Sequence, residues 1–315
     1  MGRSVRGKTL QRKALRSFLM CVVIALPGSG SAALGQELPA DRMAHRLIQV
    51  WKNLGSLPSG HELVEKAQKT WNLKAEVDFL KHLKLGASSR TDTVLTRHFS
   101  VQTGQEERER AVTIFLRENQ SDTELLLDLA HELVHATSRP VFDPYDPQLS
   151  PVQYIQTAID GAGGEVDAVL AECSVAGEVA DRGGRIARRC RNYLESSVVS
   201  SQGRRSLIRG RIAQDFYRVG TWLTEIQKDL GSETRLLPLL KSEAPRLYSS
   251  SVHAPYPVAL FQEYQDMTQA VCQNSLERKR SLELSRAVEQ VTQMPVIEKL
   301  LATRCRGGIS VAKQE

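Results

Sequence analysis

The segment from Ser121 to Pro140 contains sequence signals for both the start and the end of a helix, so it is predicted to form a single helix. Ser121 and Glu124 have the spacing of a capping box, in which each side chain accepts a backbone N–H of the first turn. Pro140 disfavours helical geometry at the residue before it, so we expect the helix to end near Ser138. Apolar residues recur between these ends at helical spacing, namely Leu125, Leu126, Leu129, Leu133 and Val134. They predict a broad apolar stripe that packs into a core.

Two β-like runs precede this helix, at residues 93–101 and 111–116. The second run, AVTIFL, is rich in β-branched residues, which favour strands. A polar stretch at 102–110 lies between the runs and predicts an antiparallel pair joined by a loop. Residues 37–85 have apolar side chains at helical spacing and are predicted to be helical.

Prolines and glycines divide the rest of the chain into helices. Pro151 is expected at the first position of one helix, and the glycine-rich residues 161–164 separate it from a helix at 165–179. Further helices are predicted at 186–198, 204–230, 257–276 and 280–303. The expected fold class is therefore α+β and predominantly helical. A small antiparallel-edged sheet from residues 93–117 should pack on the capped helix, with a helical C-terminal half.

The N-terminal residues have the order of an export signal. Residues 1–35 contain six basic and no acidic side chains, an apolar run of nine residues at 18–26, and small residues after Pro27. Nine residues are too few to span a bilayer, which takes about 20; an uncleaved anchor is the alternative. We predict a signal peptide at 1–35 and a periplasmic or secreted protein of bacterial export.

The charge balance changes once this segment is removed. The whole chain has 42 Lys and Arg against 36 Asp and Glu, so residues 36–315 carry no net charge. A neutral protein has no overall attraction for nucleic acid, and no such partner is expected. No later stretch is apolar enough to predict stable membrane insertion after signal cleavage.

Four cysteines lie outside the predicted signal peptide. An even number in an exported chain favours two disulfides, and four cysteines allow three pairings. Pairing each cysteine with its nearer neighbour closes the shorter loops at low entropic cost. This predicts the disulfides Cys173–Cys190 and Cys272–Cys305. Each is expected to add about 2–4 kcal/mol of stability.

The capped helix carries the sequence HELVH at residues 131–135. His131 and His135 are one turn apart and share a helix face, so both imidazoles can bind one zinc ion. Glu132 is too close in sequence to His131 to bind the same ion easily, but it can take the proton of a water whose pKa zinc lowers to about 7. The pattern predicts metal-assisted hydrolysis with Glu132 as general base, and two ordinary helix histidines are the alternative. The related sequence HELVE at 61–65 lacks the second histidine and is interpreted as a solvated helix face.

A β-run, a short loop and a helix that bears HExxH together resemble the zincin metallopeptidases, over about residues 93–180. Zincins divide by their third zinc ligand. The metzincin pattern requires a glycine and a further histidine soon after the motif, and residues 136–141 contain neither. The gluzincin pattern places a glutamate on a later helix, and the segment GGEVDA at 163–168 resembles it.

The gluzincin resemblance implies a site for one zinc ion per chain. The ligands that it implies are His131, His135 and Glu165. Gluzincins often have a small residue three positions after the ligand glutamate, and Ala168 fits this spacing. They often have Asp or Asn at the next position, as support for a ligand histidine. Val169 departs from that pattern and leaves the support of the histidines unexplained.

Other acidic residues are alternatives for the third ligand. Glu172 is the main rival, because it lies about two turns after Glu165 on nearly the same helix face. Asp160 and Asp167 are weaker alternatives. Asp128 can act either as a support for a ligand histidine or as an ordinary surface residue of the capped helix.

The resemblance also implies a substrate cleft. In zincins the strand before the active helix forms the sheet edge and pairs with an extended peptide, which assigns this role to residues 110–117. A His, Tyr or Arg often stabilises the oxyanion, and His253, with Tyr248 and Tyr256 nearby, is the candidate unless it is structural. A cluster of arginines between 182 and 191 is interpreted as a solvated helix face, with contact to an anionic envelope polymer as the alternative.

Two functions follow from these observations. The first is an exported zinc-dependent peptidase that acts on a protein or peptide. The second is a non-catalytic exported helical protein, whose HExxH helix is structural or degenerate and whose C-terminal helices bind a partner. The intact Glu132 favours the first, because a degenerate site would be free to lose it. The first hypothesis divides the chain into a signal peptide at 1–35, a zincin-like catalytic region with a helical N-terminal part at 36–182, and a helical region at 183–315.

Overall fold

The computed structural model describes residues 40–99, 106–140, 142–194, 201–241, 243–249, 253–285 and 290–305. The predicted signal peptide at 1–35 lies outside these residues. The described chain is predominantly helical with one small mixed sheet, so the prediction of an α+β fold is confirmed. None of the helices in this part of the chain is long and apolar enough to cross a membrane.

The N-terminal part is helical up to residue 82. Its elements are α1 (Ala40–Gly55), α2 (Pro58–Trp71) and the 3₁₀ helix η1 (Glu76–His82). Trp51 of α1 stacks on Phe79 of η1, with ring centroids 4.3 Å apart. The helical prediction is wrong for the next residues, which form strand β1 (Leu83–Gly86), parallel to residues 114–117. So short a run has little intrinsic preference, and backbone pairing with a strand distant in sequence decides its conformation.

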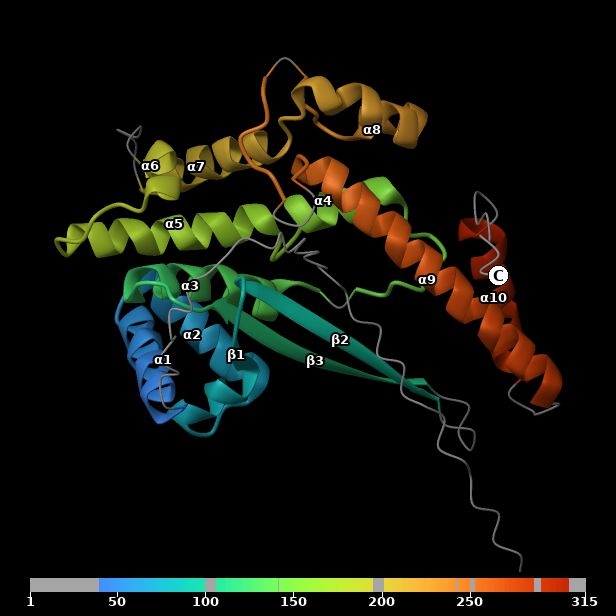
Figure 1. Ribbon diagram of the computed structural model, residues 1–315, viewed down its shortest axis with the longest axis horizontal. Coiled ribbons are helices and arrows are strands. Elements are labelled where there is room, and N and C mark those ends of the chain that lie inside the picture. The colour runs from blue at the N-terminus through green and yellow to red at the C-terminus, as the bar shows by residue number, and fades with distance from the viewer. Residues whose placement is uncertain are drawn as a thin grey trace, which may run out of the picture.

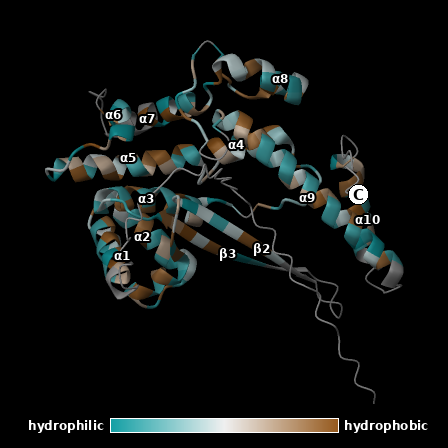
Figure 2. Ribbon diagram, viewed as in Figure 1, coloured by the Kyte–Doolittle hydropathy of each residue, from teal (hydrophilic) through white to brown (hydrophobic). Residues whose placement is uncertain are grey.

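Strands β2 (Arg90–Phe99) and β3 (Glu106–Arg117) form the expected antiparallel pair. The sheet order is β1-β3-β2, so β3 is the central strand. The expectation that the strand before the motif helix forms the sheet edge is therefore wrong for residues 114–117, where β1 pairs with the side of β3 opposite β2; β1 does not extend to residues 110–113. The β2–β3 ribbon extends away from α1, α2 and helix α3 (Asp122–Ser138; Figure 1), and the hydrophobic stretch of β3 lies at the end beside α3 (Figure 2).

Helix α3 begins and ends where the sequence predicts. The Ser121 Oγ accepts the Glu124 N–H at 3.2 Å, and the Glu124 carboxylate accepts the Ser121 N–H at 3.0 Å, which closes the capping box. The helix lies between the sheet and α2 on one side and α5 (Glu165–Asp181) on the other (Figure 1). Most of its side chains are therefore buried, including the acidic residues Asp128 and Glu132.

Helix α4 (Pro151–Ile159) precedes α5, and residues 161–164 separate the two as predicted. The remaining elements are α6 (Arg188–Leu194), α7 (Ser201–Phe216), η2 (Gly220–Trp222), α8 (Leu223–Leu230), η3 (Gly231–Leu236), α9 (Tyr256–Ser285) and α10 (Gln290–Arg304). The predicted helix at 204–230 is interrupted after Phe216, because the Val219 N–H donates to the Leu240 carbonyl at 3.1 Å. The predicted break after residue 276 is also wrong, since the charged residues there are good helix formers and α9 continues through them.

Both predicted disulfides are present. Cys173–Cys190 joins α5 to α6, and Cys272–Cys305 joins α9 to the end of α10. The hydrophobic core draws on residues from both sides of the predicted boundary at 182/183. The division of the chain into two regions stays a prediction.

Candidate metal centre

The two histidines of HELVH and Glu165 converge where α3 meets the start of α5. The Nε2 atoms of His131 and His135 lie 3.1 Å apart. One Glu165 carboxylate oxygen lies 3.5 Å from Nε2 of His131, and the other lies 3.5 Å from Nε2 of His135. All three side chains are at most 18% exposed, so water competes little for their polar atoms. The structure thus brings together the three residues that the sequence proposes as ligands.

These separations fit a tetrahedral metal ion. Bonds of about 2.0–2.1 Å from zinc to nitrogen or oxygen place neighbouring ligand atoms of a tetrahedron about 3.4 Å apart. The two Nε2 atoms here lie 3.1 Å apart, and each lies 3.5 Å from a different oxygen of the Glu165 carboxylate. Two imidazoles and one carboxylate are also a donor set that zinc accepts, and three protein ligands are typical of catalytic zinc. The donor set and its spacing therefore fit one zinc ion.

The second nitrogen of each histidine is also engaged, which fixes both rings. The Nδ1 of His131 lies 3.2 Å from a carboxylate oxygen of Glu172. The Nδ1 of His135 lies 2.8 Å from the carbonyl oxygen of Gly163. Metal-binding histidines commonly donate their other N–H to a carboxylate or a carbonyl in this way. Both Nε2 atoms consequently face the same point.

Glu172 lies on the Nδ1 side of His131 and does not join Glu165 at the Nε2 atoms. It contacts the Nδ1 side of the ring, away from the point where the Nε2 atoms meet. It therefore supplies the support that the departure at Val169 left unexplained. The two weaker alternatives are engaged elsewhere: Asp160 accepts a tyrosine hydroxyl at 2.6 Å, and Asp167 accepts a loop N–H at 3.0 Å.

The carbonyl that holds His135 belongs to a loop that requires glycine. Gly163 has a φ of +69°, and a Cβ there would lie 2.5 Å from the backbone nitrogen of Arg139. This close approach lets the Gly163 carbonyl also accept the Arg139 Nε–H at 3.0 Å. The Arg139 guanidinium then reaches Glu165 at 3.4 Å. The loop thereby fixes the end of α3 against the start of α5.

Glu132 is buried and held by strand β2. The Thr91 hydroxyl donates to Oε2 of Glu132 at 2.7 Å. Burial raises the pKa of Glu132 to about 7, although the charge of His131 and the Thr91 hydrogen bond oppose the rise. A carboxyl group with a pKa near neutrality can both accept and donate a proton at physiological pH.

The three candidate ligand side chains perturb one another electrostatically. Burial disfavours protonation of His131, but hydrogen bonds with Glu165 and Glu172 outweigh it and raise its pKa to about 10. Burial and the charge of Arg139 lower the pKa of His135 to about 3. Burial disfavours ionisation of Glu165, but the two histidines outweigh it and lower its pKa to about 2. The two carboxylates therefore favour a positive charge on His131, whereas His135 stays neutral.

Tyr256, and not His253, is the residue of its loop that interacts electrostatically with the candidate ligands. His253 is exposed, has a φ of 50° and donates its backbone N–H to Ser249. Tyr256 begins α9, and its ring packs edge-on against Phe216. The charge of Glu165, together with burial, raises the pKa of Tyr256. The tyrosine is therefore in electrostatic contact with the site.

Some contacts of the site were missed by the sequence patterns. Thr91 has no signal beyond its place in a strand, and Arg139 was expected only to end a helix. For Gly163 the available signal was the glycine pair before Glu165, because glycine permits close approach of a backbone carbonyl. The interpretation of HELVE agrees with the structure, since His61 lies on the exposed face of α2 and pairs with Glu65 at 3.7 Å.

No protein-family model matches the chain, and no curated protein or solved structure is significantly similar to it. The resemblance to zincins therefore depends on the residues described above. The class that fold and site define is an α+β protein with two histidines and a glutamate at metal-binding spacing.

Proposed function

We propose that this protein is an exported zinc-dependent peptidase of the zincin class. Its zinc ligands are His131, His135 and Glu165, and its general base is Glu132. The observation that carries the proposal is the convergence of two Nε2 atoms and one carboxylate at distances of 3.1–3.5 Å, which fits tetrahedral zinc. The engaged Nδ1 atoms support it further, because both rings are already held in the orientation that a metal requires.

The residues of the site have distinct roles in this proposal. Zinc, when bound, supplies Lewis acidity toward a water and toward the substrate carbonyl. Glu132 accepts the proton of the water and passes it to the leaving amine. Thr91 holds the carboxylate of Glu132 in place. Tyr256, whose pKa the charge of Glu165 raises, is the candidate donor to the oxyanion that develops on the carbonyl.

The position of strand β2 in the sheet is an argument for a peptide as the substrate. In the described sheet it pairs with β3 on one side and forms the outer strand. Its residue Thr91 contacts Glu132, so the outer edge of β2 begins beside the general base. An extended peptide that adds to this edge by backbone hydrogen bonds would bring a carbonyl to the site. We therefore assign the peptide-binding role, which the resemblance gives to residues 110–117, to the outer edge of β2.

The location outside the cytosol is part of the proposal. The disulfides Cys173–Cys190 and Cys272–Cys305 support folding in an oxidising compartment. With the predicted signal peptide at 1–35, this favours the periplasm or the outside of a bacterial cell.

Elemental mass spectrometry of protein purified without a metal-affinity tag tests the zinc site. We expect about one zinc ion per chain, the stoichiometry of a single catalytic site. His131→Ala should lose the zinc. His61→Ala is the matched control and should keep it, because His61 heads the HELVE sequence on the exposed face of α2.

Cleavage of a peptide library tests the reaction. Glu132→Gln should keep zinc and lose cleavage, whereas the control Glu62→Gln should keep both. Cleavage by Glu132→Gln at the unsubstituted rate would refute the general base. If the unsubstituted protein holds no zinc after incubation with excess metal and dialysis, the peptidase proposal fails and the non-catalytic helical binding protein is favoured.

A further inference from the structure

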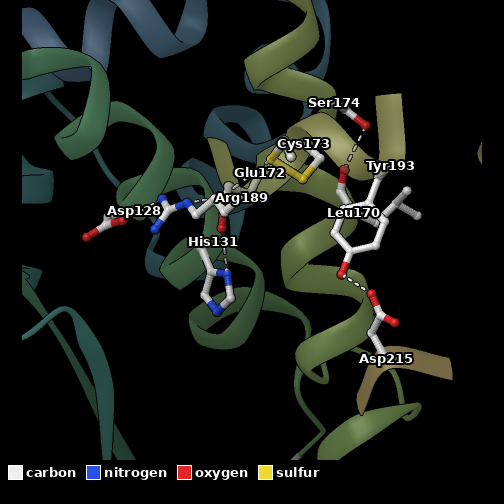
Figure 3. The surroundings of a disulfide bond; sticks show 10 residues. Asp128, His131, Leu170, Glu172, Cys173, Ser174, Arg189, Tyr193 and Asp215 are labelled. Carbon is white, nitrogen blue, oxygen red and sulfur yellow. Dashed lines mark hydrogen bonds and ion pairs between the residues drawn. A yellow bond between two sulfur atoms is a disulfide. The ribbon is translucent and has the colours of Figure 1, made fainter. Parts of the chain in front are cut away.

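One guanidinium joins the two helices that carry the metal ligands (Figure 3). Arg189 of α6 donates to Asp128 at 2.7 Å and forms an ion pair through its Nε with Glu172. Asp128 lies on α3 one turn before His131, and Glu172 lies on α5 and contacts the Nδ1 of His131. Arg189 is exposed, as the interpretation of the arginines at 182–191 expects, but that interpretation did not include its pairing with two buried carboxylates.

Arg189 covers two buried carboxylates from the solvent side. Its side chain is 49% exposed, whereas those of Asp128 and Glu172 are 8% and 4% exposed. Asp128 also accepts hydrogen bonds from Ser89 and Gln120, which are uncharged donors. Buried carboxylates are costly unless a cation pairs with them. The position of Glu172 against His131 thus depends on a charge that comes from a third helix.

The Cys173–Cys190 disulfide places this arginine. Its two cysteines directly follow Glu172 on α5 and Arg189 on α6, and their Cα atoms are 5.2 Å apart. Both cysteines are buried, so the bond anchors α6 in the core. The backbone at residue 189 is therefore fixed beside residue 172.

We propose that Arg189 is a positioning residue for the zinc site, which holds Glu172 against His131 while the Cys173–Cys190 disulfide holds Arg189 in place. The inference rests on the proposed zinc site and adds a determinant of its metal affinity that lies outside the ligands. Loss of such an outer contact commonly lowers metal affinity about 10- to 100-fold.

Zinc affinity, measured by competition with a chromophoric chelator, tests the arginine. We expect Arg189→Ala to weaken zinc binding about 10- to 100-fold. Arg189→Lys should recover most of the loss, because an ammonium group can still pair with Glu172. Cobalt(II) bound in place of zinc supplies a spectroscopic readout, since its visible bands report ligand geometry. These bands should shift in Arg189→Ala, where the ring of His131 loses its fixed partner.

The same measurement tests the disulfide. The double variant Cys173→Ala/Cys190→Ala should weaken zinc binding by a factor similar to that of Arg189→Ala. Combining all three substitutions should add little, because they act through one contact and are not independent. The matched control is Cys272→Ala/Cys305→Ala, which removes the disulfide between α9 and α10 and should leave zinc affinity unchanged. Arg188→Ala, one residue away on α6, controls for the loss of charge.

Near-ultraviolet circular dichroism identifies the variants that fold, and Arg189→Gln replaces Arg189→Ala if the latter does not. Unchanged zinc affinity and an unchanged cobalt spectrum in a folded variant without Arg189 would overturn the inference and leave the zinc site standing. An equal loss of affinity in the two disulfide variants would overturn the role of Cys173–Cys190. If the unsubstituted protein binds no zinc, the proposed function itself has failed.

Discussion

Thr91 of β2 and Glu132 of α3 are joined by a hydrogen bond of 2.7 Å between the threonine hydroxyl and the carboxylate oxygen Oε2. The same hydroxyl lies 3.1 Å from the backbone carbonyl oxygen of Glu132. The sheet thus orients the proposed general base directly. We expect Thr91→Val to keep the zinc and to lower kcat/KM for peptide cleavage about tenfold or more, the effect of losing a hydrogen bond to a charged group.

Thr96→Val is the control for this substitution. Thr96 lies further along β2, opposite Glu109, and it is exposed. The substitution Thr96→Val should leave kcat/KM for peptide cleavage unchanged. An equal fall in both variants would attribute the effect to the strand as a whole and not to the contact with Glu132.

Alanine substitutions should separate the two glutamates of α5. Glu165→Ala removes a proposed ligand and should abolish stoichiometric zinc. Glu172→Ala removes a partner of His131 and should keep one zinc ion per chain while lowering affinity about 10- to 100-fold. Zinc content after dialysis and competition with a chelator measure both quantities. If Glu172→Ala lost more zinc than Glu165→Ala, the roles assigned to the two glutamates would be reversed.

Gly163→Ala should destabilise the protein. Alanine at a φ of +69° is strained, and its Cβ would lie 2.5 Å from the Arg139 backbone nitrogen. We expect a loss of at least about 1 kcal/mol in the free energy of unfolding, measured with urea. Gly183→Ala is the matched control, since its φ is +91° and nothing lies within 4 Å of the added Cβ. Equal losses would show that the contact with Arg139 adds nothing to the cost of the backbone conformation.

Asp78 should make stability depend on pH in the acidic range. Its pKa is lowered from 3.8 to about 2, first by the hydrogen bond from Lys81 and then by the backbone N–H groups of Ala75 and Lys74. Because the pKa of Asp78 is lower in the folded state, its ionised carboxylate stabilises the fold fully above pH 3.8, the ordinary pKa of an aspartate. This stabilisation is lost as the pH falls toward about 2.

The variant Asp78→Asn should therefore unfold at lower urea concentration than the parent at neutral pH, with a difference that shrinks in acid. Unfolding curves recorded from neutral to acidic pH measure this directly. A difference that stays constant over the whole range would contradict the linkage.

Features confined to one turn or one short loop could be predicted from the sequence. The capping box of Ser121 and Glu124 involves residues three apart, so local geometry alone defines it. The pairing of Cys173 with Cys190 followed from loop length, which is a property of the unfolded chain. The shared helix face of the two histidines has the same local origin.

Features that depend on how elements meet could not be predicted. The composition of strand β3 does not show whether it is a central or an edge strand. Its central position results from pairing with β1, which is distant in sequence. Arg189 looks like its neighbours in the sequence until α6 is placed against α3 and α5.

The different roles of Glu165 and Glu172 also could not be predicted from the sequence. Seven residues span about 10.5 Å along a helix, so two carboxylates at this spacing need not bind one ion. They can instead contact the two nitrogens of one imidazole ring, as they do at His131. The sequence places both on one face, but the orientation of the ring decides their roles.

The disulfide between α5 and α6 also has a consequence for the order in which the chain is made. During translation His131 and His135 are synthesised first, and Glu165 and Glu172 follow. Arg189 and the neighbouring Cys190 are synthesised last. A nascent chain that stops before α6 therefore has the complete set of proposed ligands but neither the arginine nor the sulfur bridge that holds it. Under the proposed function, assembly of the zinc site thus finishes only when this disulfide forms, which separates the synthesis of the proposed ligands from the moment at which they are held firmly.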